Sequence, residues 1–178
     1  MNYGSILKTD IADGPGVRVT LFVSGCRNRC PGCHNAEAQD FSFGKHFGEA
    51  AEDEIIAALK PDYIKGLTLC GGEPFEPENQ PSVLELTRQV KARFPQKEIW
   101  AFTGNRFDDD LLAKKCGPWD VTEALLGTID VLVDGAFVEE LKDMGLRFRG
   151  SSNQRLIDVP ATLARKEVVL WNDGYETM

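Results

Sequence analysis

The chain has 178 residues, of which 42% are apolar, and a formal net charge of -8 at pH 7. This length and composition predict one globular domain, and the negative charge argues against a general attraction to nucleic acid. Because no apolar run reaches membrane-spanning length and the first residues do not form a signal peptide, we expect no membrane association and a cytoplasmic location.

The first half of the chain predicts a strand, a helix and a second strand. Residues 17–23 are rich in β-branched side chains and alternate in polarity, as a strand does. Residues 52–60 place apolar side chains on one helical face, and Pro61 ends that helix. Residues 64–70 form the next predicted strand, which the sequence Gly71-Gly72-Glu73-Pro74 breaks abruptly.

The second half repeats this alternation. A helix is predicted over 81–94, starting with a proline that suits the first helical turn. Strands are predicted at 98–102 and 129–133, with shorter helices at 108–115 and 122–127 between them. Strands that alternate with helices imply right-handed crossovers and a parallel sheet, which gathers ligand groups at the carboxyl ends of its strands.

Three cysteines, Cys26, Cys30 and Cys33, lie in one short loop directly after the first predicted strand. Three thiolates are an incomplete ligand set for a [4Fe-4S] cluster, and they leave one iron open to another ligand. A structural zinc site with His34 as fourth ligand is the alternative, although no second cysteine pair follows at the usual distance. Disulfides are disfavoured because the cysteines number five and a chain of this length can build its own core.

Three further loops follow predicted strands, so a parallel sheet would bring them to the same edge as the cysteines: 71–73, 103–104 and 134–135. Glycines allow close backbone approach, and the exposed carbonyls and Glu73 can accept hydrogen bonds from a ligand ammonium group. Thr103 and Asp134 either cap the helices that follow or hold the ribose or carboxylate of a ligand. Each loop alone is typical of a tight turn, but together they favour a site.

Other features carry less functional information. Cys70 is expected to be a small buried apolar side chain, Cys116 a surface or loop thiol, and His46 a residue without a role. Residues 160–178 form a possible C-terminal extension. Within it, 168–171 could be an added strand or an interface patch.

Several segments resemble the glycyl-radical-enzyme activases of the radical S-adenosylmethionine superfamily. The N-terminal signature of those activases is similar to three segments of this chain: Asp13–Arg18, Phe22–Cys26 and Cys30–Asn35. The resemblance continues through four more: Gly71–Pro74, Trp100–Gly104, Asp130–Gly135 and Arg149–Arg155. The last segment is similar to the branch that activates anaerobic ribonucleoside-triphosphate reductase, and it differs from the longer pyruvate formate-lyase activases.

The resemblance implies an α/β fold, namely a partial parallel β/α barrel of the radical S-adenosylmethionine type that forms a single domain over 1–178. It implies that Cys26, Cys30 and Cys33 bind three irons of a [4Fe-4S] cluster and that S-adenosylmethionine binds the fourth. The candidate cosubstrate-binding residues are Gly32, Cys33, His34, Gly71, Gly72, Glu73, Thr103 and Asp134. Of these, 71–73 would receive the methionine amino group, and Gly32 and His34 would flank the adenine.

The activity implied by the resemblance is that of an oxidoreductase in an anaerobic setting. Reductive cleavage of S-adenosylmethionine would give methionine and a 5'-deoxyadenosyl radical, which abstracts hydrogen from a glycine of the reductase. The expected partners are the glycyl radical component of anaerobic ribonucleoside-triphosphate reductase and an electron donor of the flavodoxin or ferredoxin type. Asp13 would lie near the incoming glycine segment.

One position departs from the pattern, and three other functions remain open. Ala136 stands where relatives often carry a basic residue, so any contact of that cation is absent or is made by another residue such as Lys142. The alternatives are an activase of another glycyl radical enzyme, a radical S-adenosylmethionine synthase acting on a small molecule, and a zinc-binding interaction module.

Overall fold

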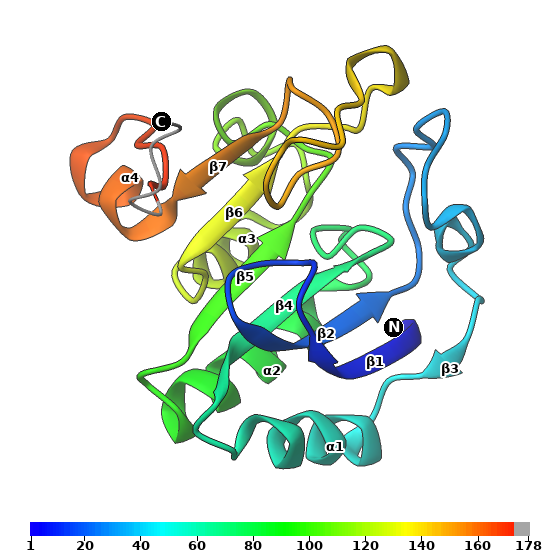
Figure 1. Ribbon diagram of the computed structural model, residues 1–178, viewed down its shortest axis with the longest axis vertical. Coiled ribbons are helices and arrows are strands. Elements are labelled where there is room, and N and C mark those ends of the chain that lie inside the picture. Colours follow the sequence, from blue (N-terminus) through cyan, green and yellow to red (C-terminus); the bar gives the residue numbers. More distant parts are fainter. Residues whose placement is uncertain (173–178) are drawn as a thin grey trace.

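A seven-stranded sheet forms the centre of the computed structural model, which describes residues 1–172 (Figure 1). The spatial order of the strands is β3-β1-β2-β4-β5-β6-β7. The four central strands run parallel: β2 (Val17–Val23), β4 (Ile64–Gly71), β5 (Glu98–Phe102) and β6 (Val131–Asp134). The outer strands pair antiparallel: β1 (Asn2–Asp10), β3 (Lys45–His46) and β7 (Arg155–Asp158).

The predicted α/β class and the parallel central strands are confirmed, whereas the antiparallel edges were not predicted. β1 was missed because its residues are mostly exposed or half-buried, and because Gly4 and Lys8 interrupt any regular alternation of apolar and polar residues. β7 has only four residues. Within residues 1–172 the sheet order ends at β3 and at β7, so the sheet is open.

The helices occupy the connections between strands. The α-helices are α1 (Glu49–Leu59), α2 (Gln80–Arg93), α3 (Trp119–Leu126) and α4 (Val159–Arg165). Single turns of other helix types are η1 (Ala36–Gln39), η2 (Phe107–Leu111) and η3 (Glu139–Leu141). No helix of residues 1–172 is both long enough and apolar enough to cross a membrane.

Two predicted helices differ from the structure. Residues 108–115 do not form a regular α-helix: one π-helical turn, η2, is followed by Lys114 with a φ of 62°, a left-handed conformation that a helix does not continue through. The helix predicted at 122–127 begins earlier than expected, at Trp119, and Pro118 is its N-cap residue. α4 was missed, although Asp158 caps it by accepting a hydrogen bond from the Ala161 N–H at 2.9 Å.

The two faces of the sheet are covered differently. Alternate strand residues such as Leu21, Leu69 and Ile99 pack with the apolar faces of α1, α2 and α3 in the main core. The opposite face carries a smaller cluster in which Trp100 packs with side chains that include Phe148 and Trp171. Consecutive right-handed crossovers in one direction place all their helices on one face, so the other face is left to this smaller cluster.

The segment after α4 returns to the sheet. The Asp158 N–H donates to the Val169 carbonyl at 2.9 Å, and the Trp171 N–H donates to the Leu156 carbonyl at 2.8 Å. Residues 168–171 therefore pair with β7 through an isolated bridge at Leu170, as an irregular extension of the sheet. The last part of the predicted extension, 173–178, lies outside the described residues.

Candidate functional site

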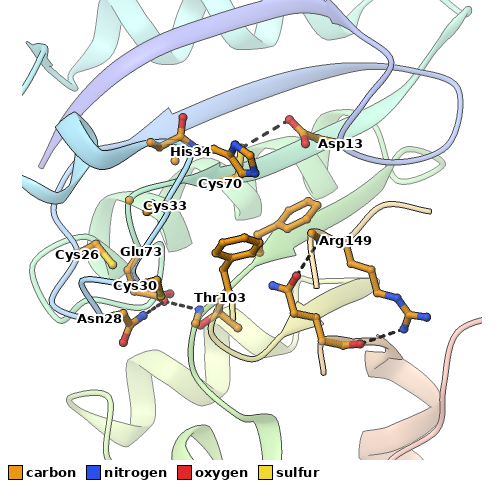
Figure 2. Close-up of a pocket in the computed structure, with 18 of the residues that line it drawn as sticks. Asp13, Cys26, Asn28, Cys30, Cys33, His34, Cys70, Glu73, Thr103 and Arg149 are labelled. Carbon is orange, nitrogen blue, oxygen red and sulfur yellow. Dashed lines mark hydrogen bonds between the residues drawn. The ribbon is translucent and has the colours of Figure 1, made fainter. Parts of the chain in front are cut away.

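A cavity of about 520 Å³ lies at the carboxyl ends of the parallel strands (Figure 2). The loops that follow β2, β4, β5 and β6 all contribute to its wall. Most of the residues predicted as site residues line it: Asp13, Cys26, Cys30, Cys33, His34, Gly71, Gly72, Glu73 and Thr103. Gly32 and Asp134 do not. Among the lining residues, Arg149 is the one Lys or Arg.

The cysteine loop presents three free, half-buried thiols. Burial raises the pKa of the Cys26 thiol to about 11, with Glu73 adding to the effect, so this thiol is neutral in the metal-free protein. A bound metal would displace its proton. Cys70 also lines the cavity, but it belongs to β4, and its Sγ lies 3.9 Å from Asp13 Oδ2.

The donor set of this loop suits a cluster. Within residues 1–172 no three His, Cys, Asp or Glu side chains converge on a point that a single metal ion would occupy. A [4Fe-4S] cluster binds each thiolate through a different iron, so its ligands do not have to converge in that way. The free thiols of Cys26, Cys30 and Cys33 are therefore chemically suited to hold a cluster of this kind.

The glycines after β4 bring two loops into contact. The Gly72 N–H donates to the Val23 carbonyl at 2.7 Å, which ties the end of β4 to the end of β2. A Cβ at Gly72 would lie 2.6 Å from the Gly25 carbonyl oxygen, so a larger residue would force the loops apart. Gly71 has a φ of 97°, which favours glycine.

Glu73 is buried directly behind the cysteine loop, with 2% of its surface exposed. Its Oε1 accepts a hydrogen bond from the Phe75 N–H at 2.9 Å, and its Oε2 accepts one from the Gly104 N–H at 2.8 Å. Oε2 also accepts from Asn28 Nδ2 at 3.1 Å. Burial raises the pKa of this carboxyl to about 7 in the metal-free protein, although the hydrogen bonds from the Phe75 and Gly104 N–H groups oppose the shift.

Asp13 lies at another side of the cavity. Its carbonyl accepts a hydrogen bond from Thr68 Oγ1 at 2.9 Å, and Thr68 Oγ1 in turn accepts one from Arg18 Nε at 2.7 Å. Burial raises the pKa of the Asp13 carboxyl to about 7, and the negative charge of Asp10 adds to the shift. Arg18 is fully buried beneath this loop.

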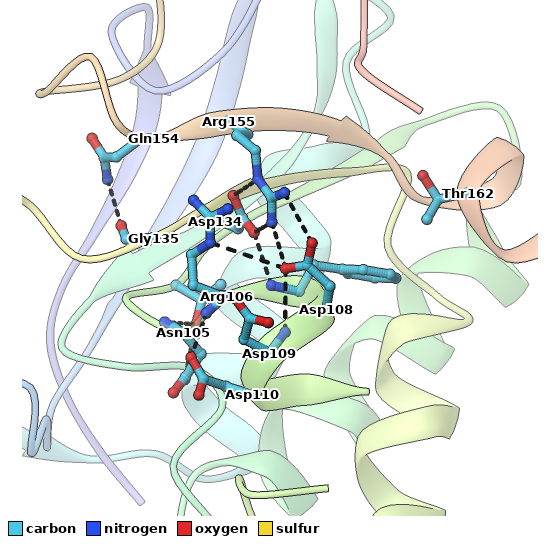
Figure 3. A network of polar contacts seen from close by, with 12 residues as sticks. Asn105, Arg106, Asp108, Asp109, Asp110, Asp134, Gly135, Gln154, Arg155 and Thr162 are labelled. Carbon is cyan, nitrogen blue, oxygen red and sulfur yellow. Dashed lines mark hydrogen bonds and ion pairs between the residues drawn. The ribbon is translucent and has the colours of Figure 1, made fainter. Parts of the chain in front are cut away.

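Thr103 and Asp134 cap turns. Thr103 Oγ1 accepts hydrogen bonds from the backbone and the side chain of Asn105, both at 3.0 Å. The fully buried Asp134 accepts from the Phe107 N–H at 2.8 Å, at the start of η2, and from Arg155 Nη2 at 2.5 Å. Figure 3 shows Arg155 between Asp134 and Asp108. The Asp134 carboxylate is therefore committed to this network, and Gly135 lines the cavity in its place.

The remaining predicted residues lie as follows. Gly32 has a φ of 68° and lies against the Glu139 carboxylate, which a Cβ would approach to 2.9 Å. His34 lies on the cavity wall with its ring 5.6 Å from the Phe137 ring. Lys142 is exposed and does not line the cavity, so in residues 1–172 it supplies no cation at the wall.

Three cysteine and histidine predictions outside the loop can also be compared with the structure. Cys70 is buried, as expected. Cys116 lies in a loop but is buried, so its expected surface position is wrong: its carbonyl accepts a hydrogen bond from the buried Gln80 side chain, which draws the loop onto α2. His46 is exposed on the short edge strand β3.

Sequence reasoning missed two residues that shape the site, Asn28 and Arg18. The position of Asn28 between two cysteines is a signal that could have drawn attention to it. Nothing in the sequence indicates that Glu73 is its hydrogen-bond partner. Arg18 lies on the strand face opposite the apolar residues that point into the main core, and because it is buried there its charge needs buried acceptors. Those acceptors come from β4 and β5, far away in sequence.

Comparison with known proteins defines the class first. A family model described as a 4Fe-4S single cluster domain matches residues 12–157, a range that contains the cysteine loop and every strand end around the cavity. The chain is thus an α/β protein that belongs to the 4Fe-4S single cluster domain family.

Curated relatives narrow the class. The anaerobic ribonucleoside-triphosphate reductase-activating protein of Escherichia coli (strain K12) is 44% identical over 86% of this chain and 96% of its own length. The protein of that name from Vibrio cholerae serotype O1 is 46% identical over the same shares. That of Enterobacteria phage T4 is 40% identical over 88% of this chain and 93% of its own. This chain belongs to the family of anaerobic ribonucleoside-triphosphate reductase-activating proteins, as its motifs predicted.

Proposed function

We propose that this protein activates anaerobic ribonucleoside-triphosphate reductase. Cys26, Cys30 and Cys33 would hold a [4Fe-4S] cluster, which would supply the electron for reductive cleavage of S-adenosylmethionine to methionine and a 5'-deoxyadenosyl radical, and transfer of a hydrogen atom from a glycine of the reductase to that radical would leave a glycyl radical. The observation that carries this proposal is that three free cysteines of one loop and the glycine-rich end of β4 share one cavity wall. The names of the relatives supply the partner.

The residues of the cavity divide the work of binding and orientation. Cys26, Cys30 and Cys33 hold the cluster. The backbone at Gly71 and Gly72 offers carbonyl groups to the methionine ammonium of the cosubstrate. His34 lies on the adenine side of the proposed site, where the neighbouring Phe137 ring adds an apolar surface.

Other cavity residues exclude water or lie where the partner protein is expected to enter. Phe102, Phe137 and Phe148 line the cavity and exclude water from it, which protects a reactive radical from side reactions. Asp13 stands where we expect the glycine segment of the reductase to enter. Relatives often carry a basic residue at the position of Ala136, and in this chain Arg149 on the cavity wall takes over that role.

The same proposal covers the architecture and the surroundings. The open sheet, with its helices on one face, is a partial parallel β/α barrel of the radical S-adenosylmethionine type, and it forms one domain over 1–178 with 160–178 as an extension. A flavodoxin- or ferredoxin-type protein supplies the electron. The five free cysteines support the reducing cytoplasm as the compartment.

The test uses protein reconstituted without oxygen. We expect about four irons and four sulfides per chain, methionine and 5'-deoxyadenosine on reduction with S-adenosylmethionine, and a glycyl doublet in the electron paramagnetic resonance spectrum once the reductase is added. Cys30→Ala should abolish all three. Cys116→Ala is the matched control, since that cysteine is buried away from the cavity and should leave them unchanged.

Two outcomes would overturn the proposal. Cleavage of S-adenosylmethionine without a radical on the reductase would favour an activase of another enzyme or a synthase acting on a small molecule. One tightly bound zinc per chain, with no iron-dependent absorbance, would favour a zinc module.

A further inference from the structure

The carboxylate of Glu73 is almost fully engaged by protein donors. It receives the Phe75 N–H from its own loop, the Gly104 N–H from the loop after β5, and the Asn28 amide from the cysteine loop. Two carboxylate oxygens offer about four lone-pair positions, so three are filled. With 2% exposure, Glu73 reaches little beyond these partners. It is therefore poorly placed to serve as a main ligand of a cosubstrate.

Asn28 is the one of these donors that belongs to the cysteine loop, midway between Cys26 and Cys30. Figure 2 shows Asn28 and Glu73 joined by a hydrogen bond beside Cys30, with the second bond of Glu73 leading to the loop of Thr103. Asn28 also packs closely on the glycine of that loop, because a Cβ at Gly104 would lie 2.1 Å from Asn28 Nδ2.

A second set of contacts restrains the cysteine loop at Arg27, the residue before Asn28. The Arg27 N–H donates to Glu76 Oε1 at 2.7 Å, and the Arg27 guanidinium pairs with Glu76 and Glu78. The backbone then passes through Arg29 at a φ of 48°, which a non-glycine residue adopts only when its surroundings hold it there. Adjacent residues 27 and 28 are thus fixed by three glutamates of the segment after β4, namely Glu73, Glu76 and Glu78.

We propose that Asn28 is a positioning residue of the cysteine loop, and that Glu73 acts through it, linking the ends of β2, β4 and β5 before any cluster is bound. The link itself is independent of function, while its purpose, a fixed spacing of the cluster ligands, rests on the proposed function. Glu73 then sets the geometry of the loop, and the backbone at Gly71 and Gly72 receives the cosubstrate.

The first experiment measures amide hydrogen exchange in the metal-free protein, which needs neither cosubstrate nor partner. In Asn28→Ala we expect exchange of the segment Arg27–Cys30 to rise about tenfold, the effect of losing one buried hydrogen bond. The Gly104 amide should stay protected, since Glu73 still accepts it. In Glu73→Gln, both the segment and Gly104 should exchange faster.

Two further variants separate the contact from the residues that make it. Gly104→Ala leaves Asn28 and Glu73 in place but puts a methyl group where the Asn28 amide lies, so it should raise exchange of Arg27–Cys30 as Asn28→Ala does. Asn35→Ala is the matched control: this asparagine also lines the cavity, and it makes no side-chain hydrogen bond at the start of η1. It should leave the exchange of Arg27–Cys30 unchanged.

The second measurement follows iron release to a chelator from the reconstituted protein. Asn28→Ala and Glu73→Gln should each speed release about tenfold, and the double variant no more than Glu73→Gln alone, because Glu73→Gln already weakens the contact that Asn28→Ala removes. Titration with S-adenosylmethionine should show similar affinities in the two single variants. Unchanged exchange in Asn28→Ala would overturn the proposal, as would a loss of S-adenosylmethionine affinity confined to Glu73→Gln.

Discussion

Arg18 is a fully buried cation in the middle of the sheet. Its guanidinium donates to Thr68 Oγ1 and to the carbonyls of Leu67 and Glu98, and it lies 5.4 Å from the centre of the Trp100 ring. Burial lowers its pKa to about 10, which still leaves it charged at neutral pH. The alternation of residues in β2 predicts which face of the sheet Arg18 occupies. It does not predict that this face is shielded from solvent.

At the same scale, Asp13 makes stability depend on pH. Its folded pKa of about 7 lies above that of an unfolded aspartate, so from about pH 4 to 7 only the folded state holds this proton. Stability therefore falls as pH rises through this interval, by up to about 1.4 kcal/mol per unit. The charged and titratable groups that face Asp13 are Asp10 on β1 and Cys70 on β4, with Arg18 on β2 below.

The prediction is that Asp13→Asn removes this contribution. Urea unfolding of the metal-free protein should show that the variant gains stability relative to the parent as pH rises from 4.5 to 7.5. Glu73 titrates in the same interval, but it is present in both proteins and cancels in the difference. Parallel stability curves for the two proteins would contradict the assignment.

At the scale of elements, β4 owes its close fit to Gly66. This residue pairs with Glu98 of β5, and a Cβ on it would lie 1.9 Å from the Glu98 carbonyl oxygen and 3.0 Å from Arg18 Nη2. The missing side chain lets the Arg18 guanidinium reach that carbonyl between the strands. Glycine normally weakens a strand, so its presence here marks a close approach of another group.

We predict that Gly66→Ala lowers the free energy of unfolding by about 2–3 kcal/mol, because the clash is with backbone and cannot relax by a side-chain rotation. Gly127→Ala is the control: it follows α3, has a φ of -64°, and its nearest neighbour to a new Cβ is 3.4 Å away. It should change stability by less than about 1 kcal/mol. Equal losses in the two variants, measured by chemical denaturation, would show that Gly66 has no special role.

Elements with strong local signals were predicted well. α1 and α2 combine an apolar face with a proline boundary, and the structure confirms both within three residues of the predicted ends. β1, β7 and the π-helical turn η2 were missed because their stability comes from distant partners. η2, for example, begins where the buried Asp134 accepts the Phe107 N–H, 27 residues away in sequence.

At the scale of the whole molecule, the C-terminal segment closes the face of the sheet opposite the main helices. The Trp171 ring lies 4.9 Å from the Trp100 ring at an interplanar angle of 80°, and 6.4 Å from the Phe148 ring at 67°. Phe148 also lines the cavity. A segment for which the sequence indicated no role thus supports the base of the site.

Trp171→Ala should therefore destabilise the protein by about 2 kcal/mol, since a half-buried aromatic side chain loses its packing. Leu170→Ala is the neighbouring control. That side chain is 62% exposed and should cost less than about 0.5 kcal/mol. Tryptophan fluorescence during urea unfolding measures both effects, and a larger loss for Leu170→Ala would refute the packing role.

As with the fold, only those parts of the candidate site that form local motifs could be predicted from the sequence. The cysteine loop and the glycines at 71–72 could be found from sequence because each motif is local and follows a predicted strand. The link between Asn28 and Glu73 joins residues 45 positions apart, and that between Asp134 and Arg155 spans 21. Such pairs cannot be read from periodicity, because either partner is compatible with an ordinary exposed turn.

All three cysteines of the site belong to one loop outside the sheet, half-buried at its carboxyl edge, while the core is built without them. We therefore expect folding and cofactor insertion to be separable events, in which the polypeptide folds first and receives iron and sulfide afterwards from the open side of the cavity. We expect iron and sulfide that are lost from the folded chain to be replaced by the same route, without synthesis of a new chain.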